Sequence, residues 1–206
     1  MPSIEGGGVE KNLFIVSNYL AKKLDKISII SASLKYKRKF KKNINFIGPK
    51  SKIWDTKSRR TKYLVCLYFL LKQIIKDKNI LVFAFQANIY CIIVCKLFGI
   101  KIITRSNSAP AGWSKNIVKK LIFQYFLNAA DLVMANSQEF VRSLKKEFDL
   151  DALCIYNPLD VNNIIYQSNK NKKKYFKTKK IKILNIGRFT DQKDQITLVK
   201  SLNEIK

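Results

Sequence analysis

Short apolar runs alternate with amphipathic stretches along most of this chain. Each run is bounded by glycine or polar residues, which is typical of parallel strands that are buried on both faces. The runs predict strands at Ile27–Ser31, Ile44–Ile47, Ile80–Phe85, Ile100–Thr104, 131–137 and Leu153–Tyr156. Because stretches with helical periodicity separate these strands, we predict an α/β fold, a Rossmann-like parallel sheet with helices on both faces.

The predicted helices have apolar residues at every third or fourth position. They cover residues 9–24, 57–75, 87–98, 113–129 and a segment that begins near residue 136. Gly99 fits the C′ position of the third helix, and Asn136 and Glu139 have the spacing of a capping box at the start of the last. The helix after Lys57 has cations at its start and bulky apolar residues behind them. It could lie on an anionic membrane or pack on the sheet, and we favour packing.

A second kind of pattern lies near the end of the sequence. The apolar run Ile181–Ile186 predicts a buried parallel strand, Gly187 ends it, and a helical pattern opens at Asp191–Asp194. A strand, a short turn and a helix N-terminus form an anion site, because free backbone N–H groups and the helix dipole face the turn. Arg188 and Lys193 bring two cations to it, so a diphosphate would fit. The alternative is an ordinary turn with two solvated basic side chains.

Polar and glycine residues also gather where ligands bind in open α/β sheets, at the carboxyl ends of strands. Glycines before the first helix would allow close approach of a ligand, and a guanidinium or amide can bind phosphate or sugar hydroxyls. The candidate binding residues are Gly6, Gly7, Gly8, Gln86, Arg105 and Asn107. The alternatives are a flexible N-terminal tail and solvated loops.

Charge narrows the classes of partner. The 206-residue chain has 40 Lys and Arg against 14 Asp and Glu, a net charge of +26, which implies affinity for nucleic acid, acidic lipid or phosphorylated substrates. The cations are mostly Lys and are spread over the whole chain, which favours a membrane surface over a nucleic-acid groove. No His is present, which excludes His-based triads, His general bases and His metal ligands within this chain.

Cysteine usage and hydropathy indicate the compartment. The four Cys residues lie inside apolar runs, so we expect buried thiols in a reducing compartment rather than disulfides. We recognise no signal peptide, and the apolar stretches fall short of the roughly 20 residues that span a bilayer. A cytoplasmic location is therefore expected.

Four motifs follow one another in an order that resembles a known family. They are the glycine loop Gly6–Glu10, the run Ala130–Ser137, the turn Asn157–Asp160 and the turn Gly187–Lys193. Together they resemble the retaining, GT-B-fold glycosyltransferases of family 4. The polar residues around Gln86 and Arg105 are similar to those of a branch of the family that lacks the usual His.

The resemblance implies a retaining, hexosyl-type glycosyltransferase. It would transfer a sugar from a nucleotide-sugar donor to a glycan or lipid-linked acceptor in cell-surface polysaccharide synthesis. Arg188 and Lys193 would be catalytic by stabilising the departing diphosphate. No metal and no cofactor are implied, since the nucleotide sugar is a substrate. The protein would act in the cytoplasm, in peripheral contact with the anionic inner face of the membrane and without nucleic acid.

The same resemblance divides the chain and sets its expected limits. Residues 1–166 would form the acceptor-side domain, 167–180 a Lys-rich linker, and 181–206 the first strand and helix of a truncated donor-binding domain. The first strand of the sheet would be missing, as would the Glu-x7-Glu pattern of the donor domain, so we expect the chain alone to be inactive. The alternatives are a basic nucleic-acid-binding α/β protein, which explains the charge but not the loops, and a degenerate, non-catalytic gene product.

Overall fold

The computed structural model describes residues 1–2, 4, 7–33, 35–86, 88–107, 116–170, 181–187 and 189–204. Contacts divide the chain into two units, Met1–Asp160 and Val161–Lys206, and each is described by itself. The predicted domain boundary lies at residue 166, inside a helix of the second unit, and the assignment of the units to acceptor and donor domains stays a prediction.

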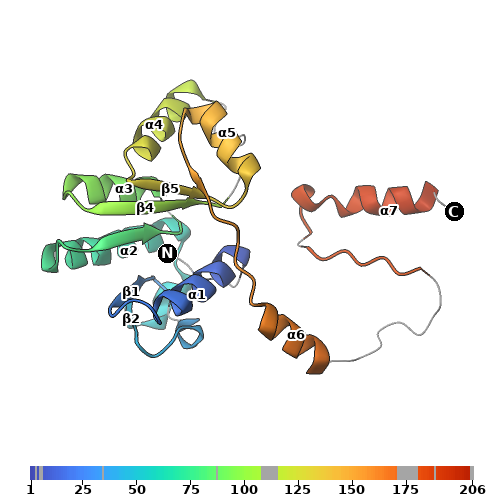
Figure 1. Cartoon of the computed structure of the whole chain (residues 1–206), viewed down its shortest axis with the longest axis horizontal. Helices are drawn as coiled ribbons and strands as arrows, with labels where there is room; N and C mark the ends of the chain where they lie inside the picture. Colours follow the sequence, from blue (N-terminus) through green and yellow to red (C-terminus); the bar gives the residue numbers. More distant parts are fainter. Residues whose placement is uncertain are drawn as a thin grey trace. The chain divides into compact units, whose positions relative to one another are not determined.

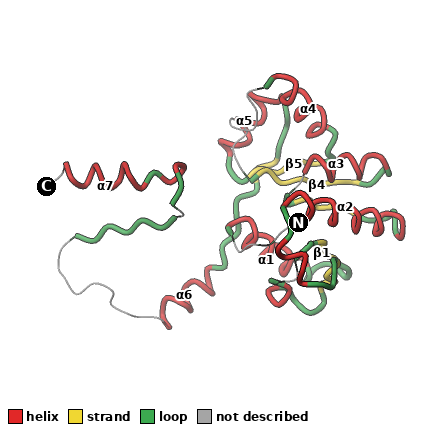
Figure 2. Tube along the Cα trace, turned by 180° about the vertical axis from the view of Figure 1, so that it is seen from behind, coloured by secondary structure: helices red, strands yellow, loops and turns green. Residues whose placement is uncertain are grey.

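The first unit is built on parallel strands with helices on both faces (Figures 1 and 2). One sheet has two strands, β1 (Ile27–Ile30) and β2 (Ile44–Ile47), paired in parallel. The other has four parallel strands in the order β3, β4, β5, β6. They are β3 (Leu81–Ala84), β4 (Lys101–Ser106), β5 (Leu132–Ala135) and β6 (Leu153–Cys154). The predicted Rossmann-like α/β fold is confirmed.

The parallel sheet is interrupted between β1 and β3. One further strand at this place would give seven strands in the order 3-2-1-4-5-6-7, which is the order of a doubly wound sheet extended by one strand. The first residues of the chain lie along the free edge of β1, because the α-amino group of Met1 donates to Ile30 O at 2.7 Å. The N–H of Ala32 donates to Pro2 O at 3.2 Å. Among the described residues no strand precedes the first helix, and the expectation that the sheet lacks a strand stays a prediction.

Five helices accompany the strands of the described first unit. They are α1 (Gly8–Leu20), α2 (Arg59–Lys76), α3 (Asn88–Leu97), α4 (Ile117–Asn128) and α5 (Gln138–Phe148). Two short 3-10 helices, Lys37–Lys39 and Lys52–Thr56, lie in the loops. No helix in the described ranges is both long and apolar enough to cross a bilayer.

The buried residues of α2 show which side of this helix packs on the protein. On α2, every fourth residue from Lys62 through Cys66 and Leu70 to Ile74 is buried, and Lys62 Nζ donates to Asp55 O at 2.8 Å. The prediction that this helix packs on the protein is confirmed. Leu70 and Ile74 join a core between α2–α5 and the four-stranded sheet, and a second core lies between α1, β1 and β2.

The sequence predicted the residues that end α3 and begin α5, and the structure agrees with the first prediction but not with the second. Gly99 has φ +67° after α3, and Ile100 N–H donates to Cys95 O at 2.8 Å, so the predicted C′ glycine is confirmed. The N-cap of α5 is Ser137, whose hydroxyl accepts from Phe140 N–H at 3.1 Å, and not the predicted Asn136. The cap is Ser137 because its extended backbone directs the short hydroxyl at the N3 amide.

The second unit contains α6 (Val161–Lys170), the 3-10 helix Asp191–Lys193 and α7 (Gln195–Glu204) in its described parts. The strand predicted at Ile181–Ile186 is wrong: these residues are not paired, and Ile181 is 93% exposed. A strand needs neighbours for its backbone groups, and the described residues of this unit form none. The predicted helical opening at Asp191 is a 3-10 turn, and α7 starts after Asp194, which has φ 42°.

Candidate functional site

Buried polar side chains gather at the carboxyl ends of the strands in the four-stranded sheet. The largest of them is Arg105, which the sequence predicts just after the strand and the structure places inside β4, at 2% exposure. Its Nη2 donates to Asn157 Oδ1 at 2.8 Å and to Ile155 O at 3.3 Å. The guanidinium is thus held by residues that follow β6, across the end of the sheet.

Arg105 has no acidic partner within the described residues. Burial lowers the pKa of its guanidinium, because desolvation disfavours the charged form, yet an arginine stays charged in proteins. Its Nε also lacks a hydrogen-bond partner in the described structure. A buried cation without a counter-charge is costly, so an anion bound here would be favoured electrostatically.

Asn157 joins Arg105 to the first helix. Its Oδ1 accepts from Asn12 Nδ2 at 2.7 Å as well as from Arg105. Asn12 lies on α1, one turn after Gly8, and is buried. The first turns of α1 and the end of β4 therefore lie at the same end of the sheet.

The glycines at the start of α1 differ in their surroundings. A Cβ on Gly7 would lie 2.8 Å from Oε2 of the buried Glu10, so a larger residue would displace this carboxylate. A Cβ on Gly8 would meet no atom within 4 Å, so the backbone there is open to a ligand. Gly6 lies outside the described residues.

Asn107 and Gln86 lie at the ends of neighbouring strands but differ in what they offer. Asn107 Nδ2 donates to Phe85 O at 2.9 Å and to Arg105 O at 3.4 Å, so this amide nitrogen ties the end of β3 to the end of β4. Gln86 Oε1 is buried and lacks a partner in the described structure. Gln86 is therefore the better placed of the two to bind a ligand.

Further buried polar atoms lack partners in the described residues along this edge of the sheet. They are Asn88 Oδ1, Thr104 Oγ1 and Asn136 Oδ1, in addition to Gln86 Oε1 and Arg105 Nε. Buried polar atoms in proteins are normally hydrogen-bonded, to protein, water or ligand. A ligand rich in hydroxyl and phosphate groups would satisfy such a set.

Comparison with known proteins identifies the family of the chain. The sequence model of Glycosyltransferase Family 4 matches residues 6–163, which include every strand of both sheets. The chain belongs to this family. None of the curated proteins matches it significantly.

In this family 4 glycosyltransferase, the second unit carries the predicted diphosphate turn. A Cβ on Gly187 would lie 3.3 Å from Lys193 Cγ, so the stem of Lys193 folds over the glycine. Asp194 Oδ1 accepts from Thr197 N–H at 3.2 Å at the start of α7. Arg188 lies outside the described residues. The catalytic role of Arg188 and Lys193 stays a prediction.

Sequence reasoning did not select Asn12 and Asn157 as binding residues, and both join the elements of the candidate site. Asn157 was named only as the start of a turn that resembles the family's, and its hydrogen bonds with Arg105 and Asn12 were not predicted. Asn12 carries no local signal, because its partner is 145 residues away. No group of three metal-ligating side chains is placed to hold an ion in the described ranges, and the expectation of metal-free transfer stays a prediction.

Proposed function

We propose that this chain carries the acceptor-side domain of a retaining GT-B glycosyltransferase. The reaction is transfer of a hexosyl group from a nucleotide-sugar donor to a glycan or lipid-linked acceptor, in the synthesis of a cell-surface polysaccharide. One observation carries the proposal beyond the family: Arg105 is a buried cation among unpartnered polar atoms at the carboxyl ends of the strands.

The chemistry of these groups suits a phosphorylated sugar. The Nε of Arg105 would donate to a phosphate oxygen, and the N–H groups at the start of α1, beside Gly8, would favour the same negative charge. Gln86, Asn88 and Asn136 would hydrogen-bond to sugar hydroxyls through their amide groups. Binding these groups would remove the cost of leaving them buried and unpaired.

The departing diphosphate would be stabilised by Arg188 and Lys193, which the resemblance assigns to the donor side. Two fixed cations lower the energy of a transition state in which negative charge builds up on the leaving group. Neither a metal ion nor a cofactor takes part in the proposed reaction. We also propose that the enzyme works in the cytoplasm, at the inner face of the membrane.

Ligand-induced thermal stabilisation of the 206-residue chain tests the site. The probes are inorganic pyrophosphate, UDP-glucose and GDP-mannose, at increasing salt. We expect the melting temperature of the wild type to rise with at least one of them, and the rise to be lost in Arg105→Gln. Arg142→Gln, at an exposed arginine of α5, is the matched control and should behave as the wild type.

An equal rise in Arg105→Gln and the wild type would contradict the proposed site. If none of the three probes raises the melting temperature while duplex DNA binds, the nucleic-acid alternative gains support. Circular dichroism of both variants checks that they are folded. A transfer assay with radiolabelled nucleotide sugars then tests the expectation that the chain alone has no activity.

A further inference from the structure

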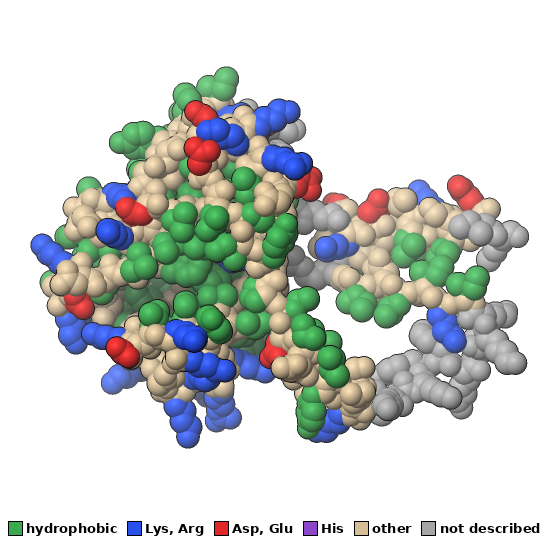
Figure 3. Space-filling model, viewed as in Figure 1, with side chains coloured by type: hydrophobic (Ala, Val, Ile, Leu, Met, Phe, Trp, Pro, Cys, Tyr) green, Lys and Arg blue, Asp and Glu red, His purple; other side chains and the backbone are tan. Residues whose placement is uncertain are grey.

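Helix α4 presents a continuous apolar face to solvent. The exposed residues recur at helical spacing, so they lie on one side of the helix. They are Ile117, Val118, Leu121, Ile122 and Tyr125, and we call them the α4 stripe. Figure 3 shows hydrophobic side chains projecting at the top of the view, where Figure 1 places α4. Single exposed apolar residues are ordinary, but five on one helix face indicate an interaction surface.

The stripe faces solvent because contacts on the opposite side of α4 hold this helix against the rest of the first unit. Leu127 is buried in the core. Lys120 Nζ lies 2.6 Å from Glu147 Oε2 of α5. At the helix start, Asn116 Oδ1 accepts from the N–H groups of Val118 and Lys119. The stripe therefore belongs to a capped and anchored helix.

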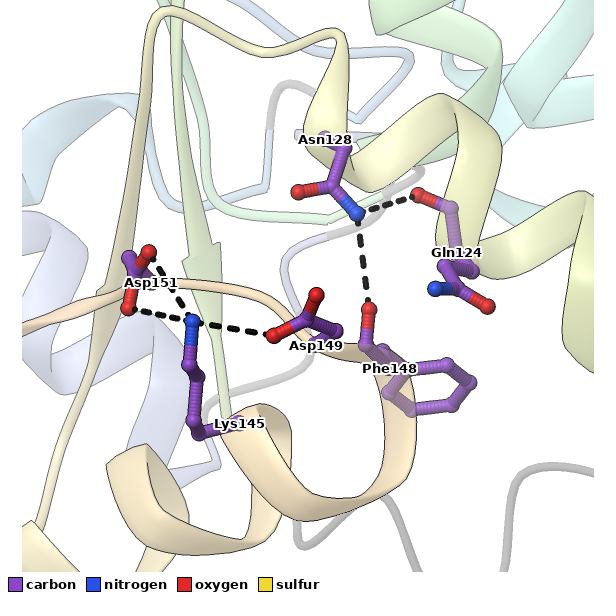
Figure 4. Close-up of polar contacts among 6 residues, drawn as sticks. All are labelled: Gln124, Asn128, Lys145, Phe148, Asp149 and Asp151. Atoms are coloured by element: carbon purple, nitrogen blue, oxygen red, sulfur yellow. Dashed lines mark hydrogen bonds and ion pairs between the residues drawn. The ribbon is translucent and has the colours of Figure 1, made fainter.

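The end of α4 is tied to the end of α5. Asn128 Nδ2 donates to Gln124 O at 3.0 Å and to Phe148 O at 3.4 Å (Figure 4). In the same view, Lys145 of α5 pairs with Asp149 at 2.9 Å and Asp151 at 3.1 Å, which fixes the turn that follows Phe148. A shallow surface hollow adjoins Leu121 and Tyr125 at this end of the stripe.

Charge selects the partner of this surface. Residues 108–128 contain no Asp or Glu and three Lys, of which Lys120 is paired with Glu147 of α5, in a chain with a net charge of +26. Two copies of such a chain repel each other, which disfavours a dimer through the stripe. An anionic bilayer attracts the same charge, and it accepts an apolar helix face at its headgroup boundary with Tyr and Lys near the interface.

We propose that the α4 stripe docks the protein on the surface of an anionic lipid bilayer. The stripe would enter the boundary between headgroups and acyl chains, with Lys119 at the level of the lipid phosphates. This inference deepens the proposed location at the inner membrane face and supplies a surface for it. It does not depend on the sugar-transfer reaction.

Helix α2 provides a matched control surface. Leu64 and Tyr68 are four residues apart and are 68% and 55% exposed, and Leu121 and Tyr125 have the same spacing with 60% and 73% exposure. On α2, however, Lys72 Nζ lies 5.5 Å from the centre of the Tyr68 ring, and the next exposed apolar residue is Ile75. The two pairs thus match in residue type, spacing and exposure but differ in their apolar neighbours.

Vesicle co-sedimentation of the full chain tests the proposal. The vesicles are phosphatidylcholine alone and phosphatidylcholine mixed with phosphatidylglycerol. We expect binding to the anionic vesicles only. The Leu121→Ser/Tyr125→Ser variant should lower the partition coefficient by about tenfold or more, because two side chains no longer leave water. The Leu64→Ser/Tyr68→Ser variant should bind as the wild type, and Lys119→Glu should weaken binding at low salt.

Three results would overturn the proposal. The wild type could fail to bind anionic vesicles, both double variants could lose binding equally, or light scattering could show a dimer that only the α4 variant loses. Thermal melts of both double variants show whether they are folded. Arg105→Gln should keep wild-type vesicle binding, so failure of the nucleotide-sugar site and failure of the docking surface give separate results.

Discussion

The side-chain oxygen of Asn157 lies 2.8 Å from Nη2 of Arg105, so a neutral amide takes the place where a buried arginine usually meets a carboxylate. The charge of the guanidinium is therefore left for a ligand. This arrangement is what a site for phosphate or diphosphate needs, because a carboxylate at position 157 would compete with the substrate for Arg105.

Asn157→Asp should make the fold more stable and should weaken ligand binding. A carboxylate would strengthen the hydrogen bonds from Arg105 and Asn12, and would raise the free energy of unfolding by about 1 kcal/mol. The same charge would weaken pyrophosphate binding about tenfold. Urea denaturation and calorimetric titration measure the two effects. Asn162→Asp, at an exposed residue of α6, should change neither, and stronger pyrophosphate binding by Asn157→Asp would refute the assignment.

Adjacent isoleucines of α2 should differ sharply in their contribution to stability. Ile74 is 0% exposed within the main core, whereas Ile75 is 72% exposed. Ile74→Ala should lower the free energy of unfolding by about 2–5 kcal/mol, because it leaves a cavity. Ile75→Ala should change it by less than about 0.5 kcal/mol. Urea denaturation gives both values, and similar losses at the two positions would contradict the burial of Ile74 and the exposure of Ile75.

The Cys95 thiol should be inert in the folded protein. Burial, followed by the effect of Cys91, raises its pKa to about 12, so at pH 8 only about one thiol in ten thousand is ionised. Iodoacetamide with mass spectrometry should label Cys95 only after unfolding. Because the unfolded thiol ionises near its ordinary pKa of 9.0, this group stabilises the fold below that pH and destabilises it progressively above. Labelling of Cys95 in the native protein at pH 8 would contradict its place in the core.

Asp131 should make the fold sensitive to acid. A hydrogen bond from Lys96 Nζ, followed by one from Ile102 N–H, both at 2.7 Å, lowers the pKa of its carboxyl below the ordinary 3.8. Its contribution is therefore complete above that value and is lost as the pH falls through the lowered pKa.

The carboxyl is partly exposed, so we expect Asp131→Asn to cost only about 1 kcal/mol at pH 7 and less in acid. Urea melts from pH 7 to acid conditions measure the difference. Asp25→Asn, at an exposed aspartate, serves as the control, and a loss that is independent of pH would argue against the ion pair.

Local patterns were sufficient for most of the fold. Apolar runs marked all six strands of the described residues, because a parallel sheet buried on both faces needs continuous apolar residues. Gly99 marked the end of α3 because the C′ position requires positive φ. Ile181–Ile186 has the same local pattern and forms no strand, since strand formation depends on neighbours that sequence periodicity does not report.

The sequence predicted where the candidate binding residues lie, but it did not predict which residues hold them in place. Arg105, Asn107 and Gln86 were expected at strand ends, and they lie there. The burial of Arg105 depends on acceptors 50 and 52 residues further along the chain, which no local pattern encodes. In the same way, the amide of Asn107 binds the backbone of the neighbouring strand, so its residue type alone did not reveal its structural contribution.

The described residues of β1 and β3 are not joined by backbone hydrogen bonds, and this affects which part of the first unit should unfold locally. No backbone hydrogen-bond ladder joins the two sheets in the described residues, so contacts such as those of Ile4 and Phe85 in their shared cluster couple them. Such coupling is weaker than a continuous ladder, so we expect the half with β1 and β2 to open as a separate cooperative group. Its amides should exchange with deuterium before those of β4, and the carboxyl edge of β4 that carries Arg105 should keep its shape when the smaller half opens.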